Sequence, residues 1–235
     1  MALIEHWQMN ETGTVDGDNT VINSVDATNH GDAVISGYTG GLETRGNLGT
    51  AYTPRLSLGS AGISTDLQAF NNGSEMTVVW WFKFPSYSTD FVFACDWHTY
   101  LASGGNSLTI TSPTNVDVVL RDDGTFSITT TEMPTNEWFA FALERDASSN
   151  WHIWINGVKQ ASTTQDTANF SLQYILGCNA YATNPTNYQC ESIRVYDSVL
   201  TEAEHLEIYR EGYPAGSGRE VARDSVRDAV RDGVR

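Results

Sequence analysis

The strongest constraint on the fold is a two-residue alternation of side-chain character in several short segments. In residues 76–83, Val78, Trp80 and Phe82 share one face, and the opposite face carries Thr77, Val79, Trp81 and Lys83. Because successive side chains of a strand point to opposite faces, this pattern predicts a strand with one face in a core and the other nearly covered. Residues 138–145 and 151–155 alternate in the same way and are predicted to be inner strands.

Turn sequences separate these strands. Asn156-Gly157 directly precedes Val158-Lys159 and suits the positive φ angles of a type I′ turn, which predicts a tight hairpin. Asp122-Asp123-Gly124 predicts a second hairpin. Further strands are expected at 172–176 and 193–196. Many short strands with evenly spaced turns indicate an all-β sandwich or barrel.

One short helix is expected after the last strand. Thr201 and Glu204 have the spacing of a capping box, in which the two side chains satisfy each other's backbone N–H groups. Leu206 and Tyr209 share one helical face, and Gly212 and Pro214 end the helix.

Composition excludes several protein classes. A chain of 235 residues with 11% aromatic side chains is able to bury a core, so disorder is excluded. Its 13 basic and 29 acidic residues give a net charge of −16, which repels nucleic acid and anionic lipid, and we expect neither as a partner. No apolar run is long enough to span a membrane. Residues 1–20 lack the basic and apolar regions of a signal peptide, so none is expected.

Charge divides the chain into unequal parts. Residues 1–212 hold 8 basic and 25 acidic groups, a net −17, and are expected to form one sandwich domain. Residues 213–218 resemble a linker, and residues 219–235 are a tetrad repeat. Together, residues 213–235 carry a net charge of +1. On a helix, Val226, Val230 and Val234 would form a slanting stripe.

The repeat predicts a helical tail used for assembly. Acidic residues precede Arg223, Arg227 and Arg231 by three positions, a spacing that favours ion pairs on the exposed surface of a helix. A helix this short is unstable alone, so it needs a partner surface or its own copies. We expect it to dock on a larger assembly or to self-associate; a frayed end is the alternative.

The order of the strand motifs resembles a known family. Residues 76–83 are similar to the "FTvsfWvk" strand of laminin G-like domains, and residues 153–157 are similar to "lYvNG". The other segments that carry the resemblance are residues 5–7, 10–13, 23–31, 137–141, 174–177, 191–197 and 199–204. Over about residues 3–212 the chain resembles the laminin G-like, concanavalin A-like jelly roll of the pentraxin-type lectin/glucanase superfamily.

The resemblance implies two antiparallel sheets closed by the short helix, in a module used mostly for binding, often of glycans. Some members are glycosidases or lyases, and related glucanases carry Glu-x-Asp-x-(x)-Glu. No strand here places two carboxylates on one face, as a retaining glycosidase requires. No zinc-protease, nucleophile-elbow or P-loop motif is present either. We therefore expect no enzymatic activity.

Oxygen-rich turns near the N-terminus predict a structural Ca²⁺ site. Calcium prefers six to eight hard oxygen ligands from flexible loops. The family often holds Ca²⁺ between such loops, although the spacing here is not that of an EF-hand. Simple Asx turns are the alternative. The candidate ligands are Asp16, Asp18, Asp26, Asn29 and Asp32.

Two loops combine aromatic and amide side chains, which suits sugar stacking and hydroxyl recognition. The second loop, 179–189, is long and polar and is the better candidate. Packing of Trp97 and Tyr100 on the sandwich edge is the alternative. The candidate ligand-binding residues are Trp97, His98, Tyr100, Tyr181 and Tyr188.

The three cysteines do not form a closed set of bridges. Free thiols are expected from the missing signal peptide. A Cys178–Cys190 bridge is the alternative if the strands that they flank are neighbours. Cys95 is expected to be a small buried apolar residue.

These patterns together predict a non-enzymatic structural and binding protein. The favoured hypothesis is a phage-type virion surface protein, a decoration or fibre protein, released by lysis, with its jelly roll outward and its tail on the particle. One alternative is a carbohydrate-binding module of a secreted enzyme or adhesin. A weaker one is a polysaccharide hydrolase or lyase, and a cytoplasmic binding protein also stays open.

Overall fold

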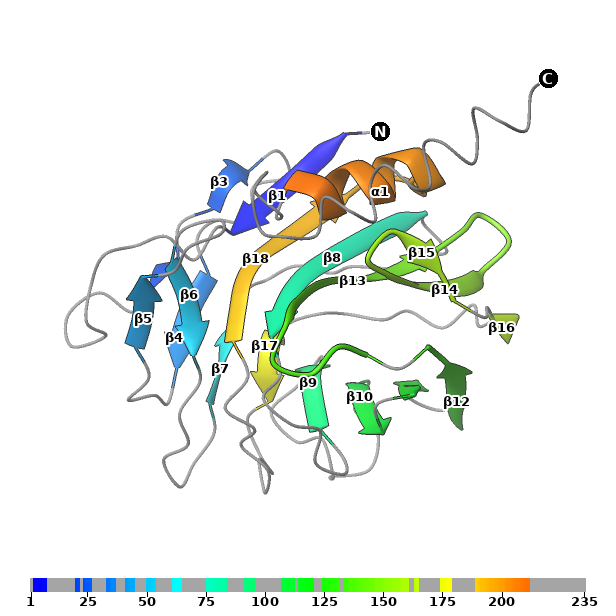
Figure 1. Cartoon of the computed structure of the whole chain (residues 1–235), viewed down its shortest axis with the longest axis horizontal. Helices are drawn as coiled ribbons and strands as arrows, with labels where there is room; N and C mark the ends of the chain where they lie inside the picture. Colours follow the sequence, from blue (N-terminus) through cyan, green and yellow to red (C-terminus); the bar gives the residue numbers. More distant parts are fainter. Residues whose placement is uncertain are drawn as a thin grey trace.

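The structure is a computed structural model, and the part of the chain that it describes holds eighteen strands, one helix and some of the segments that join them (Figure 1). The described residues are 2–7, 20–21, 23–26, 33–36, 41–44, 50–53, 61–64, 75–83, 91–95, 107–112, 114–120, 124–131, 133–160, 163–164, 174–178 and 189–211.

The described strands form two antiparallel sheets, here called sheet A and sheet B. The main path of sheet A is β15 (Val158–Lys159), β14 (Asn150–Ile155), β13 (Trp138–Arg145), β8 (Met76–Lys83), β18 (Gln189–Tyr196), β1 (Leu3–Trp7) and β3 (Asn23–Asp26). Beside that path lie β16 (Thr163–Thr164), β6 (Thr50–Thr53) and β5 (Gly41–Thr44). Sheet B runs β12 (Gly124–Thr129), β11 (Asn115–Leu120), β10 (Ser107–Ser112), β9 (Phe91–Cys95), β17 (Tyr174–Cys178), β7 (Ala61–Ser64), β4 (Ala33–Ser36) and β2 (Thr20–Val21). The jelly-roll sandwich is thereby confirmed.

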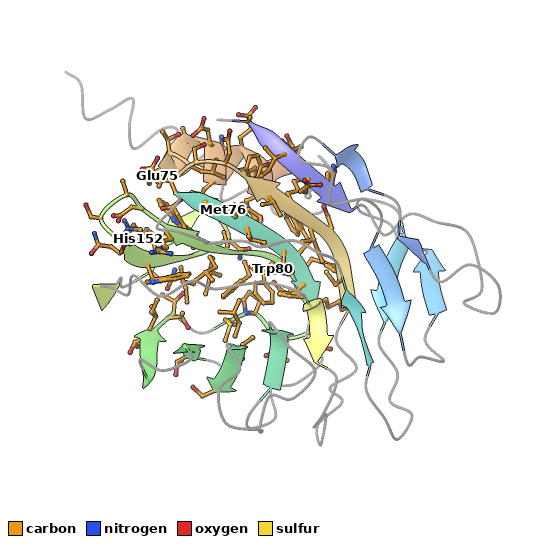
Figure 2. The ribbon with its side chains drawn as sticks, turned by 180° about the vertical axis from the view of Figure 1, so that it is seen from behind. Glu75, Met76, Trp80 and His152 are labelled. Carbon is orange, nitrogen blue, oxygen red and sulfur yellow. The ribbon has the colours of Figure 1, made fainter. Side chains whose placement is uncertain are left out.

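The core lies between the sheets and is rich in aromatic rings. Trp80, labelled in Figure 2, stacks on Phe82 at 6.3 Å between ring centroids and contacts Phe141 at 6.0 Å. Leu108 and Ile110 of β10 are fully buried from the other sheet. The predicted inner face of β8 is therefore correct, and each such side chain contributes about 1.5–3 kcal/mol of burial energy.

The opposite face of sheet A is covered by the helix α1 (Glu202–Glu211), as Figure 1 shows. Val79, Ala142 and Trp154 pack there with Ile208 of the helix. The capping box is confirmed, because Thr201 N–H donates to Glu204 Oε2 at 2.7 Å and Glu204 N–H donates to Thr201 Oγ1 at 3.3 Å.

The side of α1 that faces the sheet carries one polar and one apolar residue. Its buried residues are His205 and Ile208, whereas Leu206 and Tyr209 are only partly buried. Tyr209 still packs inward, with its ring stacked on Trp81 at 6.1 Å. His205 also makes a polar contact with Glu144 of β13, which fits this orientation of the helix.

Both predicted hairpins are confirmed. Asn156 and Gly157 have φ angles of 54° and 77°, and they join β14 to β15. Val118 pairs with Phe126 across the β11–β12 hairpin. A β-carbon on Gly157 would lie 2.8 Å from Leu206 Cα, so the turn also has to be glycine to admit the helix.

Several other expectations meet the structure only partly. The strand expected from residue 172 is described from Tyr174. Cys190 is buried and carries a thiol that is not in a disulfide, so the alternative of a Cys178–Cys190 bridge is wrong. Strands β17 and β18 belong to different sheets.

Within the described residues, no helix is long and apolar enough to cross a membrane. Residues 212–235 lie outside the described part, so the division at 212 and 218 stays a prediction.

Candidate functional site

Most of the predicted site residues lie outside the described part of the chain. Of the calcium candidates only Asp26 is described: it ends β3, where its Cα pairs with that of Glu5. The remaining calcium candidates, Asp16, Asp18, Asn29 and Asp32, are outside it. So are the ligand-binding candidates Trp97, His98, Tyr100, Tyr181 and Tyr188, and the tail residues Arg223, Val226, Arg227, Val230, Arg231 and Val234. All of these assignments stay predictions.

The described residues form three polar centres on sheet A. The first surrounds Glu144 of β13, which alternation had placed only on the face away from the core. Its Oε2 accepts hydrogen bonds from His205 Nε2 at 3.0 Å and from Leu200 N–H at 3.0 Å. Thr77 Oγ1 donates to the same oxygen at 3.2 Å, and Trp154 Nε1 donates to Oε1 at 3.3 Å.

The environment of Glu144 favours its charged form. Burial alone would raise its pKa, but the hydrogen bonds from His205, Leu200 and Trp154 and the charge of His205 hold that pKa below its ordinary value. The side chains of Glu144 and His205 are only 1% and 3% exposed, so neither reaches a dissolved substrate. This centre therefore fixes α1 to the sheet and is not an active site.

The ring of Trp154 completes this first centre. One interaction is a stack with His205 at 4.0 Å between ring centroids. Another places the Lys159 ammonium over the indole, 5.7 Å from its centroid. The ring thus contacts both the helix and the edge strand β15, and its stack on His205 favours a fixed orientation of that imidazole.

The second centre pairs His6 of β1 with Ser192 of β18. Their Nε2 and Oγ atoms are 3.0 Å apart, the spacing of a base and a hydroxyl nucleophile. Both side chains are buried. Burial first, and the charge of Arg194 second, lower the pKa of His6 to about 4. A neutral, sealed His–Ser pair ties two strands together and does not offer the hydroxyl to a substrate.

The third centre is the turn between β13 and β14. Asp146 Oδ1 accepts from the Ser148 and Asn150 N–H groups at 2.9 and 2.8 Å, and its Oδ2 lies 3.3 Å from His152 Nε2. Burial alone would raise the pKa of Asp146, but the bonds from Asn150, His152 and Ser148 lower it to about 2. The carboxylate is occupied by its own turn. Among the described side chains, no group of three His, Cys, Asp or Glu residues is placed to hold a metal ion.

Two neighbouring residues at one corner of sheet A are partly open to solvent. Trp138 and Lys83 are Cα partners at the ends of β13 and β8, and both are partly exposed although the residues next to them in their strands are buried. Gln189, the first residue of β18, is the Cα partner of Lys83 on its other side. Sequence reasoning treated Trp138 only as the start of a strand, because nothing in the alternation shows that the covering helix leaves this corner open.

Comparison with known proteins identifies relatives at the level of the family and the fold. A family model of the concanavalin A-like lectin/glucanase superfamily, Laminin_G_3, matches residues 58–204. No curated protein matches the chain.

Solved structures with the same fold include both toxin and enzyme domains. Domain 4 of AbnA, an extracellular GH43 arabinanase from Geobacillus stearothermophilus, solved with arabinotriose, superposes with a TM-score of 0.66 at 20% identity. The match covers 88% of this chain and 98% of that domain. The receptor-binding domain of botulinum neurotoxin type G gives a TM-score of 0.65 at 16% identity, with 89% and 51% covered. The chain thus spans about half of that toxin domain, and at these identities the likeness shows the fold alone.

Proposed function

The chain belongs to the concanavalin A-like lectin/glucanase superfamily, and from that premise we propose that it is a non-catalytic carbohydrate-binding domain. The observation that carries the proposal is the match to a complete arabinanase domain, 98% covered, whose structure contains arabinotriose. A domain of the same fold and almost the same extent thus serves as a precedent for a sugar complex on this scaffold.

The chemistry of the described acidic centres supports a binding role without catalysis. A glycosidase needs one carboxyl group as acid and a second as base or nucleophile, both facing the sugar. Glu144 is sealed beneath α1, and Asp146 is engaged by two backbone N–H groups of its own turn. Neither is available to protonate a glycosidic oxygen.

The biological setting is a finer proposal with two forms. In one, the chain is a virion surface protein whose segment 219–235 docks on the particle; only the tetrad pattern of that segment supports it. In the other, it is a binding module of a secreted enzyme or adhesin, and the arabinanase domain supports that form. Both forms share the same glycan-binding jelly roll.

A glycan array with the full chain tests the proposed function. We expect the protein to bind at least one class of glycan on the array, measured with calcium and again with a chelator. A parallel assay for new reducing ends should stay at background with the glycans that the protein binds. Absence of binding to every glycan would overturn the binding role, and release of reducing ends would overturn the non-catalytic one.

A further inference from the structure

The open corner of sheet A combines an aromatic ring with both signs of charge. Trp138 is partly exposed at the start of β13, and Glu137 directly before it is exposed. Lys83 lies beside Trp138 in the register of β8 and β13 and makes no ion pair with any described residue. An aromatic face flanked by a donor and an acceptor is the usual equipment of a sugar subsite.

The register also brings the start of β18 to this corner. Gln189, where the chain enters β18 after Tyr188, is the Cα partner of Lys83, and Lys83 is the Cα partner of Trp138. Neighbouring strands are about 4.8 Å apart, so Gln189 and Trp138 lie roughly 10 Å from each other across the sheet. Residues 51 positions apart in the sequence thus share one edge of the sheet.

The two lysines of the chain occupy comparable places with different partners. Lys159 has its ammonium over the ring of Trp154, and that indole is buried and stacked on His205. Lys83 neighbours an indole that remains partly open to solvent. The pair therefore offers a natural comparison between a structural lysine and one that is available to a ligand.

Charge selects the class of glycan. With a net charge of −16 the protein repels polyanions, and Glu137 adds a negative charge beside Trp138. One ammonium group does not offset that field. Neutral sugars are not repelled, and their hydroxyl groups both donate to Glu137 and accept from Lys83.

We propose that the Trp138–Lys83 row is a subsite for a neutral oligosaccharide, with the indole as the stacking surface. The assignment deepens the proposed carbohydrate-binding function and rests on it. Lys83 and Glu137 orient the sugar through its hydroxyl groups, and the backbone of Gln189, at the start of β18, borders the subsite.

The test follows the indole N–H signals of the full chain in a ¹⁵N NMR titration. The probes are the neutral oligosaccharide that the array ranks first, arabinotriose as a fixed neutral reference, and trigalacturonate as an acidic one. The Trp138 signal, assigned by its loss in Trp138→Phe, should move with the first probe. We expect Lys83→Gln to raise the Kd about threefold and Trp138→Ala to raise it about tenfold. Trp138→Phe should stay close to wild type.

Lys159→Gln is the matched control, because it removes the other lysine from the same sheet face and should leave the Kd unchanged. Wild-type binding with an unmoved Trp138 signal and an unchanged Kd in Lys83→Gln would overturn the subsite and leave the proposed function standing. Tighter binding of trigalacturonate would overturn the neutral class. Failure of the wild type to bind any glycan would overturn both proposals together.

Discussion

Glu144 Oε2 lies 3.0 Å from His205 Nε2, and this contact joins the outer face of sheet A to the helix that follows its last strand. The same oxygen accepts the N–H of Leu200, just before the helix. Because the acceptor is fixed within a buried strand, it determines which side of α1 faces the sheet. The result is that His205 and Ile208 point inward.

Removal of the Glu144 carboxylate should destabilise the domain strongly. Glu144→Ala leaves the Leu200 N–H, the Trp154 N–H and His205 without their buried acceptor, and we expect a loss of about 3–5 kcal/mol. Urea unfolding followed by tryptophan fluorescence measures it. Glu207→Ala, at an exposed position of α1, is the control and should change stability by less than about 0.5 kcal/mol. Similar losses in both variants would contradict the role of Glu144.

Stability should fall as pH drops from about 6.5 to 4 because of His6. The unfolded chain binds a proton near pH 6.5, whereas the pKa of folded His6 is about 4. The unfolded state therefore holds more protons in this window, and acid favours it by up to roughly 3 kcal/mol. Urea unfolding at pH 7 and pH 4.5 should show that the free energy of unfolding changes less between the two pH values for His6→Gln than for wild type. Equal differences would show that His6 does not titrate in this way.

Gly157 should be intolerant of a side chain for two reasons. Its φ angle of 77° is strained for other residues, and a β-carbon would meet Leu206 Cα at 2.8 Å. We expect Gly157→Ala to cost about 1–3 kcal/mol, measured by thermal unfolding. Val158→Ala, at a neighbouring side chain that is 59% exposed, is the control and should be nearly neutral. If Gly157→Ala left the stability unchanged, the backbone of the helix would not restrict the side chain at this position.

Calcium dependence tests the predicted ligands Asp16 and Asp18. If they hold a structural ion, Asp16→Asn with Asp18→Asn should lower the melting temperature in calcium but not in a chelator, because only the bound ion links these side chains to folding. Differential scanning fluorimetry in both buffers measures this. An equal loss in the two buffers would indicate Asx turns without an ion.

Residues 219–235 are predicted to mediate assembly. Light scattering of the full chain and of residues 1–212 should give a larger particle for the full chain if residues 219–235 self-associate, since a single copy of so short a helix is unstable. Truncation should leave a folded sandwich. A monomeric mass for both the full chain and the truncated chain would exclude self-association. An unfolded truncated chain would show that the tail belongs to the domain core.

Local patterns were sufficient for the strands with clear alternation and for the tight turns. The alternation in 76–83 and 138–145 reports burial on two faces, and Asn156-Gly157 reports the backbone conformation of its own turn. The side of α1 that faces the sheet did not follow from Leu206 and Tyr209, because it also depends on the buried carboxylate of Glu144. The Trp138 corner was missed for a related reason, since exposure depends on where a distant helix lies.

By itself, therefore, the sequence determined the alternating strands, the tight hairpins and the capped helix, because each of these depends on residues within a few positions of one another, and the order of the strand motifs indicated the sandwich. Only the tertiary structure decided that Glu144 anchors His205, that Gly157 must admit Leu206, and that Trp138, Lys83 and Gln189 share one row. These relationships arise from strand register and helix placement, which bring together residues far apart in the chain.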